Sequence, residues 1–174
     1  MKPSLFVIAL AACGGGGQSP TDTLSGDDGL GTLMCGASGD GTISGPIGGA
    51  EVSPIARVFQ VEVGTEGTAI VIDEGAGACG EIVDSDRLVL LFCDPPTASN
   101  QTVVDEQAFA CPGSNAASLI ETADGGDFAE ATGGSITIDS ADGACTIGSF
   151  AIDYTPNVGS PQRLTGTFAA VVCP

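Results

Sequence analysis

Short runs of β-branched and apolar residues, separated by glycine, proline, asparagine and aspartate, follow one another from Ile55 to Cys173. Each run suits a β-strand, and the residues between the runs are those that favour turns. This spacing is typical of β-sandwiches and β-barrels. We therefore expect residues 33–174 to form a single all-β domain, an antiparallel sandwich of about eight strands, which is long enough to bury a core.

The runs differ in how deeply they are expected to be buried. Residues 87–93 (RLVLLFC) are apolar throughout and are our candidate for the most buried strand, which Pro95-Pro96 ends. Residues 68–73 are β-branched on both faces, whereas 115–123 fit either a strand or two helical turns. The remaining expected strands cover 55–63, 102–111, 135–139, 145–155 and 162–173.

A hairpin is expected between 135–139 and the strand that begins at Cys145. Ala141-Asp142-Gly143 should turn the chain, because Gly143 can adopt the left-handed conformation that a bulged three-residue loop requires. This register places Ile136 and Ile138 on the same face as Phe150 and Ile152, which indicates one shared apolar surface.

The N-terminal residues resemble the signal peptide of a bacterial lipoprotein. Lys2 precedes an apolar run, and the sequence Leu10-Ala11-Ala12-Cys13 has the pattern of a lipobox. The resemblance implies that residues 1–12, a signal helix, are cleaved and that Cys13 carries the acyl chains, palmitate among them, that anchor the protein to the membrane. An ordinary secretory signal followed by a structural cysteine is the alternative.

The same resemblance implies a destination. In such proteins an aspartate directly after the acylated cysteine favours the inner membrane, but Gly14 stands there, so we expect the outer membrane. Residues 13–32 are rich in Gly, Ser, Thr, Pro and Asp and should form a flexible tether with a reach of about 25 Å.

Six cysteines lie within the expected domain, an even number that predicts three disulfides in an exported protein. Their spacings fit no zinc site, and the chain has no histidine. The six residues are Cys35, Cys79, Cys93, Cys111, Cys145 and Cys173.

One disulfide can be argued from a hairpin between 145–155 and 162–173. Folding it about Gly159 places Phe150 opposite Phe168 and Cys145 opposite Cys173, within the reach of a cross-strand disulfide. Cys79–Cys173 is the competing pairing. Gly148-Ser149-Phe150 and Gly166-Thr167-Phe168 echo each other, and we interpret each glycine as making room for a neighbouring phenylalanine rather than as part of a ligand loop.

The composition excludes several classes of partner. The net charge is −18, and Arg57, Arg87 and Arg163 are the only cationic side chains after Lys2. A nucleic-acid partner, or electrostatic docking on anionic lipid, is therefore not expected. Without histidine, neither a Ser-His-Asp triad nor a Cys-His pair can form.

Carboxylates provide the remaining candidates for chemistry. Asp105, Glu106 and Glu121 are the acidic residues within strand-like segments that a glycan hydrolase would need, although adjacent residues on a strand face opposite ways. Acidic turns supply the oxygen ligands that calcium prefers, without matching an EF-hand loop. The calcium candidates are Asp84, Asp86, Asp139 and Asp142. Asn100-Gln101-Thr102 matches a glycosylation sequon, which we interpret as a loop.

Residues 130–174 are similar to uncharacterised small β-rich lipoproteins of myxobacteria-like predatory and soil bacteria, a resemblance that implies no particular activity. We therefore expect a lipid-anchored, non-enzymatic protein of the cell outer membrane with a structural or adhesion-like binding role. Its partners would be the membrane, through the acyl chains, and a protein or glycan. A carboxylate-based glycan hydrolase and a calcium-stabilised surface module are the alternatives.

Overall fold

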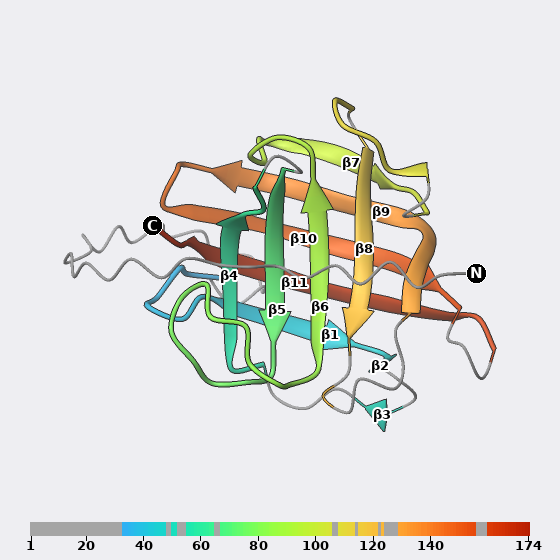
Figure 1. Ribbon diagram of the computed structural model, residues 1–174, viewed down its shortest axis with the longest axis horizontal. Helices are drawn as coiled ribbons and strands as arrows, with labels where there is room; N and C mark the ends of the chain where they lie inside the picture. The colour runs from blue at the N-terminus through green and yellow to red at the C-terminus, as the bar shows by residue number, and fades with distance from the viewer. Residues whose placement is uncertain are drawn as a thin grey trace.

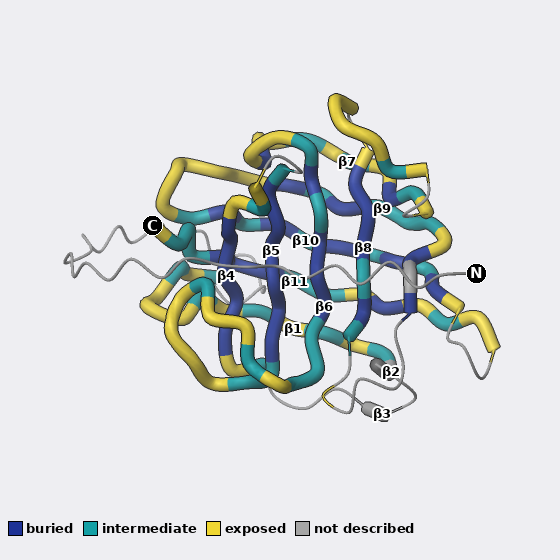
Figure 2. The backbone as a smooth tube through the Cα atoms, in the orientation of Figure 1, coloured by how far each residue is buried: buried dark blue, intermediate teal, exposed yellow. Residues whose placement is uncertain are grey.

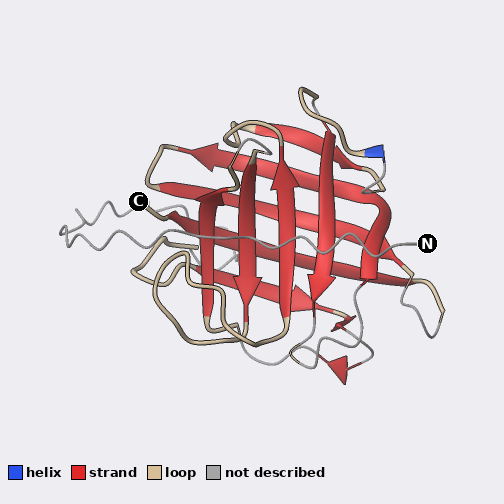
Figure 3. Cartoon of the chain, in the orientation of Figure 1, coloured by secondary structure: helices blue, strands red, loops and turns tan. Residues whose placement is uncertain are grey.

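The computed structural model describes residues 33–47, 50–51, 55–64, 67–105, 108–113, 115–121, 123, 129–155 and 160–174. The predicted signal peptide, Cys13 and the tether lie outside these residues. Within them the fold is all-β, as predicted, and strands account for most of the chain in Figure 3. The described part contains no helix with the length and apolar character needed to cross a membrane.

In order along the chain, the strands are β1 (Asp40–Ser44), β2 (Pro46–Ile47), β3 (Ala50–Glu51), β4 (Arg57–Glu62), β5 (Thr68–Asp73), β6 (Arg87–Phe92), β7 (Ser99–Val103), β8 (Asn115–Glu121), β9 (Ala129–Ala141), β10 (Cys145–Tyr154) and β11 (Gln162–Val172). Loops and turns join the strands in the described part of the chain, apart from a short helical turn at Ala108 between β7 and β8 (Figure 3). The two short strands β2 and β3 pair only with each other.

The main sheet closes into an eight-stranded barrel, so the predicted antiparallel sandwich is wrong. The strand order is β11-β10-β9-β7-β8-β6-β5-β4, and the circle closes where Phe59 and Gln60 of β4 pair in parallel with Val171 and Val172 of β11. β1 pairs with the earlier part of β11 as a ninth strand. Figure 1 shows a flattened barrel, with β4, β5, β6 and β8 in front and β1, β11, β10, β9 and β7 crossing behind them.

The inner faces of the two layers form the core, visible as the dark segments of Figure 2. The predicted hairpin is confirmed, because Gly143 has a φ of 84° and Phe150 pairs with Ile136. Ile138 and Ile152 join them in the same core cluster. The front layer adds one row of side chains that crosses four adjacent strands: Val58, Ile72, Leu88 and Ile120.

A second apolar cluster lies on the opposite face of the front layer. Phe59, Val71 and Val89 are neighbours across β4, β5 and β6, and all three are buried. Both faces of β5 and β6 are therefore buried, which explains why the sequences of these two strands read as nearly continuous apolar runs. β5, in which every residue is buried, replaces 87–93 as the most buried strand.

The three predicted disulfides are present as Cys35–Cys145, Cys79–Cys173 and Cys93–Cys111. The pairing of Cys145 with Cys173 is wrong, and the competing pairing of Cys79 with Cys173 is correct. The reason is a shift of the hairpin register by two residues, which places Cys145 opposite Val171. Residues 156–159, which include Gly159 as the predicted centre of this hairpin, lie outside the described residues.

The same register explains the two glycine–phenylalanine echoes. Gly166 lies opposite Phe150, and Gly148 lies opposite Phe168. A Cβ atom on Gly166 would approach the Phe150 ring to 2.6 Å, and one on Gly148 would approach the Phe168 ring to 2.7 Å. Each glycine therefore leaves room for the aromatic ring across the hairpin, as interpreted from the sequence.

Two further segments differ in part from the expectation. The strand expected at 102–111 is instead β7, which ends at Val103, so Asn100-Gln101-Thr102 is a strand and not a loop. The ambiguous segment 115–123 is resolved as strand β8.

Candidate functional site

A pocket of about 330 Å³ opens at one end of the barrel, where β6 ends and β8 begins. The loop after Phe92 passes through Pro95 and Pro96 before it enters β7, and it forms one wall. The residues that line the pocket are Phe92, Cys93, Asp94, Pro95, Pro96, Thr97, Gln101, Gly113 and Asn115.

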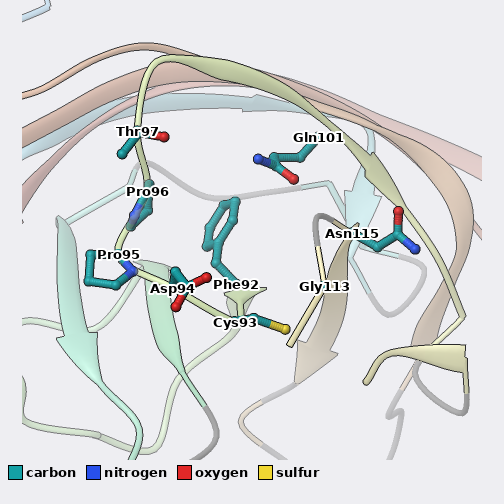
Figure 4. A pocket seen from close by; sticks show the side chains of 9 residues that line it. All are labelled: Phe92, Cys93, Asp94, Pro95, Pro96, Thr97, Gln101, Gly113 and Asn115. Atoms are coloured by element: carbon teal, nitrogen blue, oxygen red, sulfur yellow. The ribbon is translucent and has the colours of Figure 1, made fainter. Parts of the chain in front are cut away.

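The side chains of the pocket combine one aromatic ring with uncharged polar groups (Figure 4). The Phe92 ring lies at the centre and is only 4% exposed, because most of it belongs to the core. Gln101 lies on the inner side of β7, and its Nε2 donates to Ser99 Oγ at 3.0 Å, which orients the amide. Asp94 is the only charged residue of the lining. The pocket can therefore exchange hydrogen bonds with a polar ligand that is neutral or cationic.

The Cys93–Cys111 disulfide holds the second wall. Cys93 follows β6 directly, and the two Cα atoms are 5.2 Å apart. This bond ties the segment that contains Gly113 to the end of β6, so the pocket is built between two covalently joined pieces of chain. Sequence analysis identified both cysteines but gave no sign that they border a pocket.

The carboxylates predicted for a hydrolase do not gather in this pocket. Asp105 lies just beyond β7, and Glu106 lies outside the described residues. Glu121 ends β8, the strand that starts in the pocket at Asn115, and it pairs with Nε of Arg87. The pocket lining thus contributes Asp94 alone, whereas glycoside hydrolysis needs two carboxyl groups that flank one bond.

The four calcium candidates lie in two separate regions of the chain. Asp84 and Asp86 belong to the loop between β5 and β6, and Asp86 Oδ1 accepts a hydrogen bond from the Ala123 amide at 2.7 Å. Asp139 and Asp142 lie at the end of β9 and in the turn that follows it. In the described portion of the chain, no three or more acidic, histidine or cysteine side chains cluster as metal ligands would.

Asp142 has a structural partner of its own. Its Oδ1 accepts hydrogen bonds from the amides of Ala144 at 3.0 Å and Cys145 at 2.9 Å. These bonds to the charged form lower the pKa of Asp142 below its ordinary value. The carboxylate thereby stabilises the turn between β9 and β10.

A buried ion pair, which the sequence analysis did not identify, fixes the loop between β5 and β6. Arg57 donates to Asp73 Oδ2 from Nη2 at 2.6 Å and from Nε at 3.1 Å, and their side chains are 4% and 0% exposed. Arg57 Nη1 also donates to the Ala78 carbonyl at 2.7 Å. The guanidinium lies 5.0 Å from the centroid of the Phe59 ring and so covers part of the outer apolar cluster.

Comparison with known proteins returned no matching family model, no matching curated protein and no matching solved structure.

Proposed function

We propose that this chain is a non-enzymatic lipoprotein of the bacterial outer membrane that presents a disulfide-bonded β-barrel for binding at the cell envelope. The lipobox supplies the anchor, the tether supplies the reach, and the pocket beside Cys93–Cys111 supplies a place for a ligand.

The observation that carries the proposal is the division of the cysteines. The chain has seven, and the six beyond residue 33 pair with one another in three disulfides. Cys13 is thus left without a cysteine partner in its own chain, as acylation of its thiol requires. Stable disulfides also favour an oxidising compartment, where an exported lipoprotein would fold.

Metabolic labelling with palmitate tests the anchor. The wild-type chain, expressed in a bacterium with an outer membrane, should incorporate the label and fractionate with that membrane. Cys13→Ser should lose the label. Cys93→Ser, which removes a different cysteine and keeps the lipobox, should retain it. An unlabelled wild-type protein, or a mature N-terminus downstream of Cys13, would overturn the proposed localisation.

The pocket is tested with three sugars of similar size and different charge. Glucose and the cationic glucosamine should perturb the side-chain amide NMR signals of Gln101 and Asn115, whereas the anionic gluconate should not. The reason is the Asp94 carboxylate and the absence of a cation from the pocket lining. Asn100→Ala, on the opposite face of β7, is the control and should leave the response unchanged. No perturbation by any sugar at millimolar concentration would refute a polar-ligand pocket.

A further inference from the structure

The outer face of the rear layer carries a regular array of hydroxyl side chains. Two rows of residues cross β1, β11, β10, β9 and β7, and in each row neighbouring residues are cross-strand partners. The first row is Thr42, Thr167, Ser149, Thr137 and Asn100, and the second is Ser44, Thr165, Ala151, Ser135 and Thr102. We call these ten residues the hydroxyl face; none of them is buried.

The hydroxyl face contains no charged residue, although the chain carries 22 acidic ones. Charges appear only around it, at Asp40 where β1 begins and in the exposed pair of Asp153 and Arg163. The front layer differs again, because its outer face is the apolar cluster of Phe59 and its neighbours. The outer face of the rear layer is thus an uncharged polar surface on a strongly acidic molecule.

Most hydroxyl groups of this face are free to bond outward. Thr42 and Thr167 bond to each other, with 2.9 Å between their Oγ1 atoms. The hydroxyl groups of the other members make no hydrogen bond to any residue that the structure describes. Each of them has one donor and two acceptor sites, so it can bond to a hydroxyl group of a partner in either direction.

The array also has a fixed geometry. Neighbouring strands lie about 4.8 Å apart, and residues two apart on one strand lie about 6.7 Å apart, so a row across five strands spans about 19 Å. Threonine is β-branched and therefore stiff at χ1, which holds its hydroxyl group in place. Such a surface matches a long molecule with repeated hydroxyl groups better than a small compact one.

From this juxtaposition we infer that the hydroxyl face binds an extended, uncharged polysaccharide. A polyanion would be repelled by the acidic remainder of the chain, and a polycation would find no carboxylate on the face. A single hydroxyl–hydroxyl bond gains little over water, so affinity depends on many contacts made by one polymer. The inference extends the proposed binding role to a second surface and does not need the lipid anchor.

Co-sedimentation tests this inference on the full chain carrying Cys13→Ser, which is not acylated. The protein should sediment with insoluble uncharged β-glucan but not with an alginate gel, and high salt should not release it, because no ion pairs are involved. Soluble oligosaccharides should compete more strongly as they lengthen towards the span of the face, whereas glucose should not compete.

A pair of matched variants locates the binding surface. Thr137→Val with Thr165→Val removes two hydroxyl groups from the hydroxyl face while preserving side-chain shape and strand preference, and it should weaken binding about tenfold or more. Thr155→Val with Ser160→Ala removes two exposed hydroxyl groups that lie outside both the hydroxyl face and the pocket, and it should not weaken binding. Melting curves confirm that both variants are folded.

Three outcomes would overturn the inference. They are a protein that stays in solution with every uncharged glucan tried, a hydroxyl-face variant that binds as the parent does, and a control variant that loses binding equally. The palmitate experiment is independent of all three, so a failure here and a failure of the lipid anchor can be told apart.

Discussion

Removing the carboxylate of Asp73 should be among the most damaging single changes to this barrel. Asp73 is fully buried, and Oδ2 accepts both bonds from Arg57. Its other oxygen, Oδ1, accepts hydrogen bonds from the Gly75 amide at 2.8 Å and from the Ser85 hydroxyl. Asp73→Ala therefore leaves a buried guanidinium without its counter-charge and frees two donors of the β5–β6 loop.

The expected cost follows from the burial of the pair. Breaking a buried ion pair by removing one partner costs about 3–5 kcal/mol. For a domain of this size, that corresponds to a fall in Tm of roughly 10–20 °C. Denaturant unfolding of the oxidised protein, followed by circular dichroism, measures the change in the free energy of unfolding.

An exposed ion pair in the same molecule supplies the control. Arg163 and Asp153 are 3.0 Å apart, but their side chains are 56% and 47% exposed. Asp153→Ala should therefore cost about 0–1 kcal/mol, because solvent screens the interaction. Asp73→Leu combined with Arg57→Met should be less damaging than Asp73→Ala, since no unpaired charge remains buried. Equal costs for Asp73→Ala and Asp153→Ala would refute the reasoning.

Three other predictions concern the second hairpin, the β9–β10 turn and the pocket disulfide. Gly166→Ala should cost at least about 1–3 kcal/mol, because its Cβ atom would approach the Thr42 carbonyl oxygen to 2.0 Å and the Phe150 ring to 2.6 Å. Phe150→Leu should relieve only the second contact, so thermal unfolding of the double variant should show partial relief, and strict additivity would contradict a direct contact with the ring. Because the pKa of Asp142 is lowered in the folded state, its stabilisation of the turn is present above the ordinary pKa of aspartate and is lost as pH falls through the lowered pKa. NMR titration should place the pKa of Asp142 below its ordinary value, and Asp142→Asn should remove this contribution to the pH dependence of stability. Replacing both cysteines of Cys93–Cys111 should lower the free energy of unfolding by about 3 kcal/mol. Removing either long-range disulfide should lower it by roughly 4.7 kcal/mol, because Cys93 and Cys111 are separated by only 18 residues. Denaturant unfolding measures these costs, and the opposite order would contradict the explanation from loop entropy.

Local sequence patterns predicted the parts of the fold that depend on neighbouring residues. Gly143 marked the tight turn, Pro95-Pro96 marked the end of β6, and the alternation of Ile136 and Ile138 marked an inward face. Each of these signals acts within a few residues of chain, where turn chemistry and strand periodicity decide the conformation.

The pairing of strands that are distant in the sequence could not be predicted from local patterns. Inward and outward residues alternate alike in a sandwich and a barrel, and closure depends on two residue pairs between β4 and β11. The hairpin register shifted by two residues keeps every side chain on its own face, so the pattern of Phe150 and Phe168 fits both registers. The two registers differ in which residues lie directly opposite each other, and this is why the partner predicted for Cys145 was wrong.

The pocket was not predictable, because its residues carry no shared motif. Asp94 precedes two prolines and resembles an ordinary turn residue, and Asn115 opens a strand that was itself ambiguous. They become neighbours because β6 and β8 pair antiparallel with Phe92 opposite Ala116, which places the residues after β6 beside the start of β8. The hydroxyl face likewise depends on the register of five strands, which no single segment encodes.

The position of β11 in the barrel has a consequence for how the protein is made. This strand pairs with β10 along its length, with β1 in one part and with β4 near its end, yet it follows all of them in the chain. Native pairing therefore spans large sequence separations, which slows folding. A nascent chain cannot complete the barrel before β11 emerges, and this delay would favour the export that we propose, because a translocation channel passes unfolded chains.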